Sequence, residues 1–274
     1  TAARVAAGGV ARKLLATFGM RIFSFTQSIG ATASRDAAVD PEELDLDAVE
    51  ASPVRCPDPA AAQAMVAAID EAAAAGDTLG GTFRVVAVGV PPGLGSHVHW
   101  DRKLDGLLAQ ALMSIQAVKG VEIGEGFDVA GRRGSEAHDP IGWDPQRAAY
   151  HRESNWSGGL DGGITNGEPL VARVAMKPLA TLNRPVLKTV DVVTKEETVS
   201  FKERTDATAV PAMGVVAETM VALVLAREAL RKFGGDSLAE VTRNQAAYLA
   251  HLAETPSAAP DSPVAEPSGR ASGA

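Results

Sequence analysis

The chain has 274 residues, 46% of them hydrophobic, so it can bury a sizeable core as one large domain or two small ones. Its net charge of −8 arises in residues 36–72, where ten acidic residues accompany one arginine, and the remainder is nearly balanced. This distribution lacks the basic stripe of a nucleic-acid-binding surface, so we expect no nucleic-acid partner.

The single cysteine, Cys56, excludes an internal disulfide and favours a reducing compartment. The longest apolar run, residues 214–226, contains Glu218 and is too short to cross a bilayer. No signal-peptide pattern opens the sequence. We therefore expect a soluble, cytoplasmic protein without a membrane partner.

In chain order, the spacing of apolar residues predicts a helix over residues 1–18 and a strand over 20–29. The acidic stretch 36–58 is rich in Asp, Glu and Pro, which indicates loop and turn. An alanine-rich helix follows over 59–75, with Asp58 as its N-cap. A strand over 82–90 ends at two prolines, and helical spacing returns over 101–116, where Asp101 is the expected cap.

The middle of the chain, residues 124–167, is dominated by glycine and polar residues and predicts long loops. Strands are expected at 170–176, 187–193 and 198–203, with a hairpin turn at 194–197. The longest helix covers 210–233 and ends at two glycines, and another covers 238–252. The segment from 253 to 274 is rich in Pro, Ser and Ala and is expected to be a disordered tail. Strands mixed with long helices, without a βαβ rhythm, favour an α+β layered fold.

Residues 176–181 read MKPLAT, in which a strand delivers Lys177 and Pro178 then ends the pairing. Backbone amides and the Thr181 hydroxyl are left free to bind an oxyanion or a flavin edge. A surface lysine at a strand end is an equally good interpretation of this pattern.

Residues 203–208 read ERTDAT, immediately before the long helix. The guanidinium of Arg204 suits phosphate or carboxylate, and a carboxylate beside it, that of Asp206, suits proton transfer. The alternative is that Asp206 or Thr208 caps the helix.

Residues 155–167 read NWSGGLDGGITNG, with five glycines in ten residues. Such a segment lets the backbone approach a flat ligand closely, although a flexible loop has the same composition. It lacks the GxGxxG pattern of dinucleotide-binding proteins. His97 and His99 have no further ligands at a recognised spacing, so no metal site is expected.

Taken in chain order, these segments resemble the chorismate synthase family, and their residues are most similar to those of its actinobacterial members. The matching blocks are VPPGLGSHVHWDRKLDGLLAQALMSIQAVKGVEIGEGF, NWSGGLDGGITNGEPLVARVAMKPLATL and FKERTDATAVPAMGVVAETMVALVLAREALRKFGGDSLAEVTRN. The resemblance runs in register from Thr1 to about Tyr248. It implies one domain over residues 1–252, a sandwich of antiparallel sheets around central helices, and a homotetramer.

The resemblance also implies a function. Members of this family are lyases of the shikimate pathway, which leads to the aromatic amino acids. They eliminate phosphate and a proton from 5-enolpyruvylshikimate 3-phosphate to give chorismate. They need reduced FMN, although the reaction has no net redox change. Whether a separate flavin reductase using NADP keeps the FMN reduced stays open.

Position by position, the resemblance assigns flavin contacts to Gln116, Ala117, Gly162, Lys177, Pro178, Leu179, Ala180 and Thr181. Arg204 matches an arginine shared by flavin and substrate, and Asp206 matches a neighbouring acidic residue implicated in catalysis. Two departures are mild, because Ala180 replaces a commoner Pro or Ser and Thr205 replaces a commoner Ser.

The family's two catalytic histidines, its arginine cluster for the substrate phosphate and a serine-containing flavin segment have no counterpart in the sequence. The expectation is therefore an incomplete chain that forms no measurable chorismate by itself. A second hypothesis is a non-catalytic fragment that folds, assembles or binds flavin without turnover. A third is an ordinary flavoprotein oxidoreductase.

Overall fold

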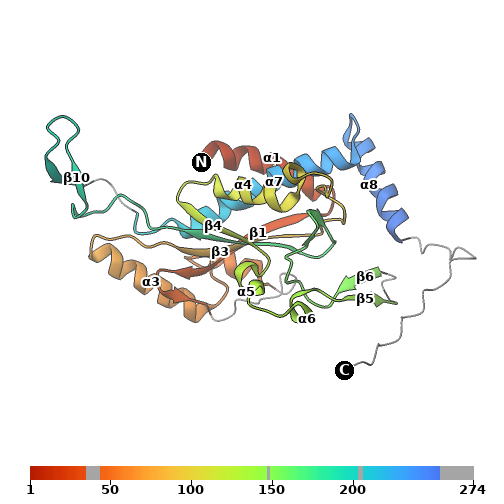
Figure 1. Cartoon of the computed structure of the whole chain (residues 1–274), viewed down its shortest axis with the longest axis horizontal. Helices are drawn as coiled ribbons and strands as arrows, with labels where there is room; N and C mark the ends of the chain where they lie inside the picture. The colour runs from red at the N-terminus through yellow and green to blue at the C-terminus, as the bar shows by residue number, and fades with distance from the viewer. Residues whose placement is uncertain (35–43, 147–148, 203–205, 254–274) are drawn as a thin grey trace, which may run out of the picture.

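The computed structural model describes residues 1–34, 44–146, 149–202 and 206–253 (Figure 1). The helices are α1 (Ala2–Ala16), α2 (Leu46–Ala51), α3 (Pro59–Ala74), α4 (Leu104–Met113), α5 (Gly126–Ala130), α6 (Gly134–Ala137), α7 (Val210–Phe233) and α8 (Leu238–Ala253), with a 3-10 turn at Trp100–Arg102. The strands are β1 (Arg21–Ile29), β2 (Thr32–Ala33), β3 (Gly81–Val88), β4 (Val118–Ile123), β5 (Ile141–Asp144), β6 (Ala149–Arg152), β7 (Leu160–Asp161), β8 (Ile164–Thr165), β9 (Leu170–Met176), β10 (Lys188–Val190) and β11 (Glu197–Val199).

Five strands form one antiparallel sheet in the order β2-β1-β3-β9-β4, and six short strands pair as three separate ribbons. Helices α1, α4 and α7 cover one face of the sheet (Figure 1), and α3 contacts the strands β1 and β2 at one edge. Because side chains alternate along a strand, Ile22 and Phe83 face the helices while Phe23 and Val86 face away. Val49 of α2 covers this second apolar cluster. The α+β class with antiparallel sheets is confirmed.

Helix α7 is the central helix of this arrangement and contacts α1, α4, β1 and β3. By length and apolar composition it would suffice to cross a membrane, but 61% of its most apolar window is buried inside the protein, as in a core helix. Glu218, in the middle of α7, is only 3% exposed. It accepts hydrogen bonds from Ser24 Oγ at 2.7 Å and Arg12 Nη1 at 2.7 Å, and from Arg55 Nη2 at 3.1 Å.

Burial raises the pKa of Glu218, although the bond from Ser24 and the charges of Arg12 and Arg55 act in the opposite direction. A lone carboxylate in this position would be very unfavourable, so the three donors are what permit a charge in the core. They come from β1, α1 and the loop after α2, and Glu218 therefore ties three separate elements to α7.

The sequence predicts most of the long elements correctly. The helices expected at 1–18, 59–75, 210–233 and 238–252 correspond to α1, α3, α7 and α8, and the strands at 20–29, 82–90 and 170–176 to β1, β3 and β9. Asp58 caps α3 as expected, since its carboxylate accepts from the N–H groups of Ala60 and Ala61. Gly234 ends α7 with a φ of 61°.

Several predictions of detail are wrong. Residues 46–51, expected as loop, form α2, whose N-cap Asp45 accepts from the N–H of Ala48. Asp101 does not cap α4, because its carboxylate lies 2.6 Å from His99 Nδ1 and the helix begins after Lys103. The strands expected at 187–193 and 198–203 shrink to three residues each. The predicted tail lies almost wholly outside the described residues and stays a prediction.

Adjacent glycines in α1 give a matched test of how closely it packs on α7. A Cβ on Gly8 would lie 2.2 Å from Thr219 Cβ, whereas a Cβ on Gly9 would meet nothing within 4 Å. We expect Gly8→Ala to lower the free energy of unfolding by about 1–3 kcal/mol, because the helices must separate. Gly9→Ala should raise it by roughly 0.5–1 kcal/mol, because alanine favours the helix. Urea unfolding of both variants measures these changes, and equal effects would contradict the close packing of α1 on α7.

Candidate functional site at one end of the sheet

Most of the predicted site residues gather at one end of the five-stranded sheet. Met176, the last residue of β9, pairs with Gly81 at the start of β3 and with Val118 at the start of β4. Because the strands are antiparallel, the residue after Met176 lies at the same edge as the residues before Gly81 and Val118. Segments that are far apart in the sequence are therefore neighbours here.

The turn of Gln116 and Ala117 is bonded directly to the loop that follows β9. The backbone N–H of Lys177 donates to the carbonyl of Ala117 at 2.9 Å. Ala117 has a left-handed φ of 66°, an uncommon conformation for a residue with a Cβ. The side chain of Gln116 is exposed at this turn. The structure thus brings together two segments that the sequence assigns to the flavin.

A third segment, residues 78–80, links this loop to the stretch before α7. The hydroxyl of Thr78 donates to the carbonyl of Leu179 at 2.7 Å, and the N–H of Leu79 donates to the carbonyl of Ala207 at 2.7 Å. A Cβ on Gly80 would lie 2.3 Å from the carbonyl oxygen of Met176, so only glycine fits this contact. Sequence reasoning missed these residues, and the Gly80–Gly81 pair before a strand is the one signal that points to them.

We call the group of residues 78–80, 116–117, 177–181 and 206–207 the sheet-end site. Within it, the side chains of Lys177, Thr181 and Asp206 are exposed, while Leu179 is half-buried and packs against the core. Neither Lys177 nor Asp206 forms an ion pair with another described residue. The site therefore presents an ammonium group, a hydroxyl and a carboxylate to solvent. Arg204, the other predicted catalytic residue, lies outside the described residues.

The alternative role for Asp206, capping α7, is not what the structure shows. The N-cap position of α7 is Ala209, which makes no side-chain cap. The nearest substitute is Thr208, whose hydroxyl accepts from the N–H of Val210 at 3.4 Å. The carboxylate of Asp206 is thus left for another role.

Gly162 does not join the sheet-end site within one chain. It lies in the turn between β7 and β8 with a φ of 62°, and nothing stands within 4 Å of where its Cβ would be. The next residue, Gly163, accepts from the N–H of Leu104 at 2.9 Å, at the start of α4. Gln116 follows the other end of α4, a ten-residue helix about 15 Å long. The open space at Gly162 still permits the close approach of a flat ligand.

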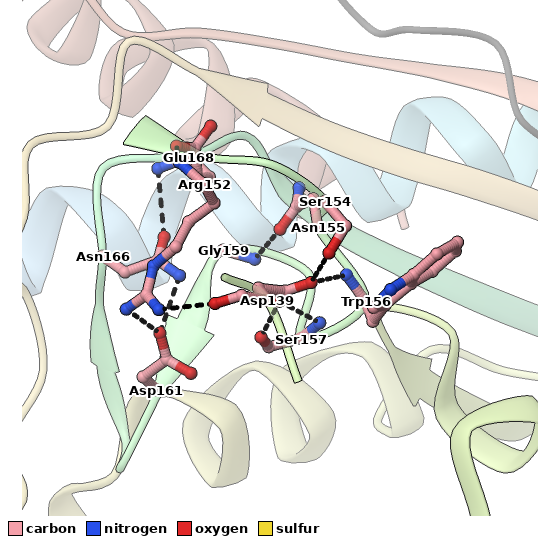
Figure 2. A network of polar contacts seen from close by, with 10 residues as sticks. All are labelled: Asp139, Arg152, Ser154, Asn155, Trp156, Ser157, Gly159, Asp161, Asn166 and Glu168. Atoms are coloured by element: carbon pink, nitrogen blue, oxygen red, sulfur yellow. Dashed lines mark hydrogen bonds and ion pairs between the residues drawn. The ribbon is translucent and has the colours of Figure 1, made fainter. Parts of the chain in front are cut away.

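Gly162 lies in the glycine-rich loop, residues 155–167. The buried carboxylate of Asp139 holds this loop (Figure 2). Its Oδ1 accepts from Ser154 Oγ at 2.6 Å and from the N–H of Trp156 at 2.7 Å. Its Oδ2 accepts from the N–H of Ser157 at 2.9 Å and from the Ser157 hydroxyl. Burial alone would raise the pKa of Asp139, but these four bonds outweigh it and hold the pKa below its ordinary value.

Arg152 extends this network to the turn itself (Figure 2). Its guanidinium donates to the carbonyl of Asp139 at 2.9 Å and to Asp161 Oδ2 at 2.9 Å, and Asn166 donates to the same Asp161 oxygen. The residue before Gly162 is thus fixed by two donors. The sequence predicts only a long loop here and assigns no role to Asp139.

A family model described as chorismate synthase matches residues 1–230. The chain belongs to the chorismate synthase family. It is 56% identical over 257 residues to a chorismate synthase of Symbiobacterium thermophilum, covering 92% of this chain and 64% of the relative. It is 57% identical over 256 residues to one of Saccharopolyspora erythraea, covering 93% and 63%.

A solved structure titled "Crystal Structure of Chorismate Synthase" superposes with a TM-score of 0.79 at 44% identity, covering 92% of this chain and 69% of that one. The chain thus spans slightly less than two thirds of the length of the curated relatives named above. The sheet-end site and the glycine-rich loop both lie within the residues that the family model matches.

We predict that Asp139→Asn loosens the glycine-rich loop without unfolding the protein. Hydrogen bonds to a charged group contribute about 1.5–3 kcal/mol each, so the N–H groups of Trp156 and Ser157 should exchange roughly tenfold to a hundredfold faster. Hydrogen exchange measured by mass spectrometry tests this, with Asp128→Asn on the exposed side of α5 as the control. Equal exchange in the two variants would contradict the anchoring role.

The same carboxylate predicts a pH dependence of its own. A group whose pKa is lowered by folding stabilises the fold above its unfolded pKa, and this contribution is lost as the pH falls through the folded pKa. Protection of the N–H groups of Trp156 and Ser157 against hydrogen exchange should therefore fall in acid in the parent protein. It should fall less steeply in Asp139→Asn. Parallel acid profiles for the two proteins would contradict this prediction.

Proposed function

We propose that this chain supplies flavin and substrate contacts of an enzyme that eliminates phosphate from 5-enolpyruvylshikimate 3-phosphate to form chorismate. The observation that carries the proposal is the sheet-end site. Three segments that the family resemblance assigns to flavin or catalysis, far apart in the sequence, are joined there by hydrogen bonds between Ala117 and Lys177, Thr78 and Leu179, and Leu79 and Ala207.

The residues of this site fit reduced FMN by their chemistry. Lys177 offers a cation for a phosphate or a ring oxygen, Thr181 offers a hydroxyl, and the half-buried Leu179 offers an apolar edge. The backbone beyond Pro178 is released from the sheet, since β9 ends at Met176. Reduced FMN, when bound, supplies the electron density that helps an allylic phosphate to leave and then recovers it.

The reaction breaks one carbon–oxygen bond to phosphate and one carbon–hydrogen bond, and the new double bond takes up the electrons, so no oxidant is consumed. The proton must pass to a base, and the exposed carboxylate of Asp206 is the group in the sheet-end site suited to receive or relay it. The side chain of Lys177 would stabilise negative charge that develops on the departing phosphate.

The finer assignments extend this proposal. They are a homotetrameric assembly, a cytoplasmic location, and reduction of the FMN by NADP-dependent chemistry or a separate reductase. An ordinary flavoprotein oxidoreductase would instead oxidise one flavin for each product formed. The proposed lyase should release phosphate and chorismate in equal amounts while the flavin ends each turnover reduced.

We expect Lys177→Ala to weaken the binding of reduced FMN by roughly tenfold, equivalent to about 1.4 kcal/mol, because one charge contact is lost. Anaerobic titration followed by flavin fluorescence gives the dissociation constant. Lys13→Ala, at the exposed end of α1, is the control and should bind like the parent protein. Unchanged affinity in Lys177→Ala would count against a flavin contact at this residue.

Asp206→Asn should lower kcat for chorismate formation by about 10²–10⁴, the usual contribution of a positioned acid or base, while FMN affinity changes little. The assay uses the protein as its cell produces it, with reduced FMN and anaerobic detection of phosphate and chorismate. Asp70→Asn, an exposed substitution on α3, is the control. Full activity in Asp206→Asn would remove this residue from the mechanism.

A further inference from the structure

The loop of residues 177–182, which follows β9, has few hydrogen bonds to the rest of the protein. At its two ends, Lys177 and Asn183 each donate their N–H group to a backbone carbonyl of a neighbouring segment, at 2.9 and 3.1 Å. Between these two bonds, a single hydrogen bond joins the loop to the other described residues. Its donor is the hydroxyl of Thr78 and its acceptor is the carbonyl of Leu179, at 2.7 Å. The middle of the loop is therefore placed by Thr78.

Thr78 is itself held in a fixed position. The residue is 5% exposed, and its N–H donates to the carboxylate of Asp77 at 2.8 Å. The N–H of Asp77 donates in turn to the carbonyl of Ala72, in the last turn of α3, at 2.8 Å. On the other side, Gly80 lies so close to Met176 that a Cβ there would be 2.3 Å from the carbonyl oxygen. The hydroxyl of Thr78 therefore reaches the loop from a rigid base.

The bond from Thr78 also sets the direction of the next peptide group. The described residues have no cis peptide bond, and in a trans peptide the C=O and the following N–H point in opposite directions. Because the carbonyl of Leu179 faces the buried hydroxyl, the N–H of Ala180 faces away from it. Ala180 is exposed, and no described residue accepts a bond from its N–H. A fixed, unpaired N–H of this kind can donate to an oxygen of a ligand.

We infer that Thr78 is a positioning residue for the flavin. Its hydroxyl fixes the loop so that the ammonium group of Lys177 and the N–H of Ala180 are in place before the ligand arrives. Thr78 is buried, so it acts through the carbonyl of Leu179. A loop that is ordered beforehand loses less entropy on binding, which raises affinity. This inference rests on the proposed function, because the ligand is the reduced FMN proposed for the sheet-end site.

Removal of the hydroxyl gives the first test. Thr78→Val keeps the shape of the side chain and should bind reduced FMN roughly tenfold more weakly than the parent protein, since the loop must then be ordered on binding. Thr78→Ser keeps the hydroxyl and should bind within about twofold of the parent. Anaerobic titration followed by flavin fluorescence gives both dissociation constants.

Thr219→Val is the matched control. Thr219 lies in α7, is 2% exposed, and donates its hydroxyl to a backbone carbonyl at 2.7 Å, as Thr78 does. The two substitutions therefore remove the same kind of bond, but Thr219 has no contact with the loop of residues 177–182. Thr219→Val should bind reduced FMN like the parent protein.

A double-mutant cycle with Lys177 separates positioning from a general loss of stability. If Thr78 acts by placing Lys177, the double variant Thr78→Val/Lys177→Ala should bind about as weakly as Thr78→Val alone, roughly tenfold below the parent. Two independent effects would instead multiply to roughly a hundredfold loss. Titration of the parent, the two single variants and the double variant measures this coupling.

Hydrogen exchange tests the placement of the loop without flavin. In Thr78→Val the N–H groups of Lys177 and Asn183, at the two ends of the loop, should exchange roughly threefold to tenfold faster, because the bond between them is lost. They should exchange at the parent rate in Thr78→Ser and in Thr219→Val. Mass spectrometry of the peptides that contain these residues gives the rates.

The outcomes distinguish this inference from the proposed function. A parent protein that binds no reduced FMN would overturn both. If the parent binds FMN and Lys177→Ala binds it more weakly, the proposed function stands. The inference alone is then overturned by parent-like affinity in Thr78→Val, by a multiplicative loss in the double variant, or by weak binding in Thr78→Ser. Should Thr78→Val not fold in circular dichroism, Thr78→Ala removes the same hydroxyl with less bulk and carries the same expectations.

Discussion

The buried carboxylate of Glu218 is the interaction on which the arrangement of this chain depends. A charged group in a helix core is tolerated only when donors surround it, and here Ser24, Arg12 and Arg55 bring together β1, α1 and the loop after α2. Removing Glu218 would take the shared acceptor from the buried hydroxyl of Ser24 and from the largely buried guanidinium of Arg55. Specific bonds of this kind fix the angle and depth of α7 more narrowly than apolar packing alone.

The position of α7 in turn fixes the candidate site. The helix begins at Val210, and Ala207, just before it, accepts a bond from Leu79. Leu79 adjoins Thr78, which holds the carbonyl of Leu179, and the loop of Leu179 begins with the bond to Ala117. A continuous path therefore runs from the central helix through the sheet-end site, made of two backbone hydrogen bonds and the bond from the Thr78 hydroxyl. The placement of the exposed side chains at that site therefore depends on hydrogen bonds to backbone groups of neighbouring segments.

The sequence predicts well those helices and strands that have a long repeated pattern of apolar residues or a clear N-cap residue. Repeated apolar spacing identifies α7, and Asp58 before Pro59 identifies α3. Helix α2 was missed because its six residues span less than two turns and its acidic composition resembles a loop. Asp101 was placed as a cap because its type and position suited that role, but His99 competes for its carboxylate. A choice between two nearby hydrogen-bond partners leaves no periodic pattern in the sequence.

The residues of the candidate site likewise include some that the sequence predicts and some that it does not. Family resemblance found Lys177 and Asp206 from sequence motifs, but the bridge through Thr78 and Leu79 uses backbone carbonyls that any residue could supply. Asp139 was missed because its four donors lie 15–18 residues further along the chain. The separation of Gly162 from the sheet end follows from the length of α4, which the order of motifs does not convey.

Residues 186–201 form an arm in which β10 pairs with β11, and this pairing affects how readily the sheet-end site forms. More than twenty residues separate Thr181 from Asp206, and an unstructured connection of that length would lose considerable entropy when its ends meet. Pairing between β10 and β11 folds most of the connection back on itself, so that only the two short stems remain to be closed. The closure cost changes by about 0.6 kcal/mol for each halving of a flexible loop. The arm therefore shortens the effective length of the connection between Thr181 and Asp206. The two segments can meet at the entropic cost of closing a much shorter loop.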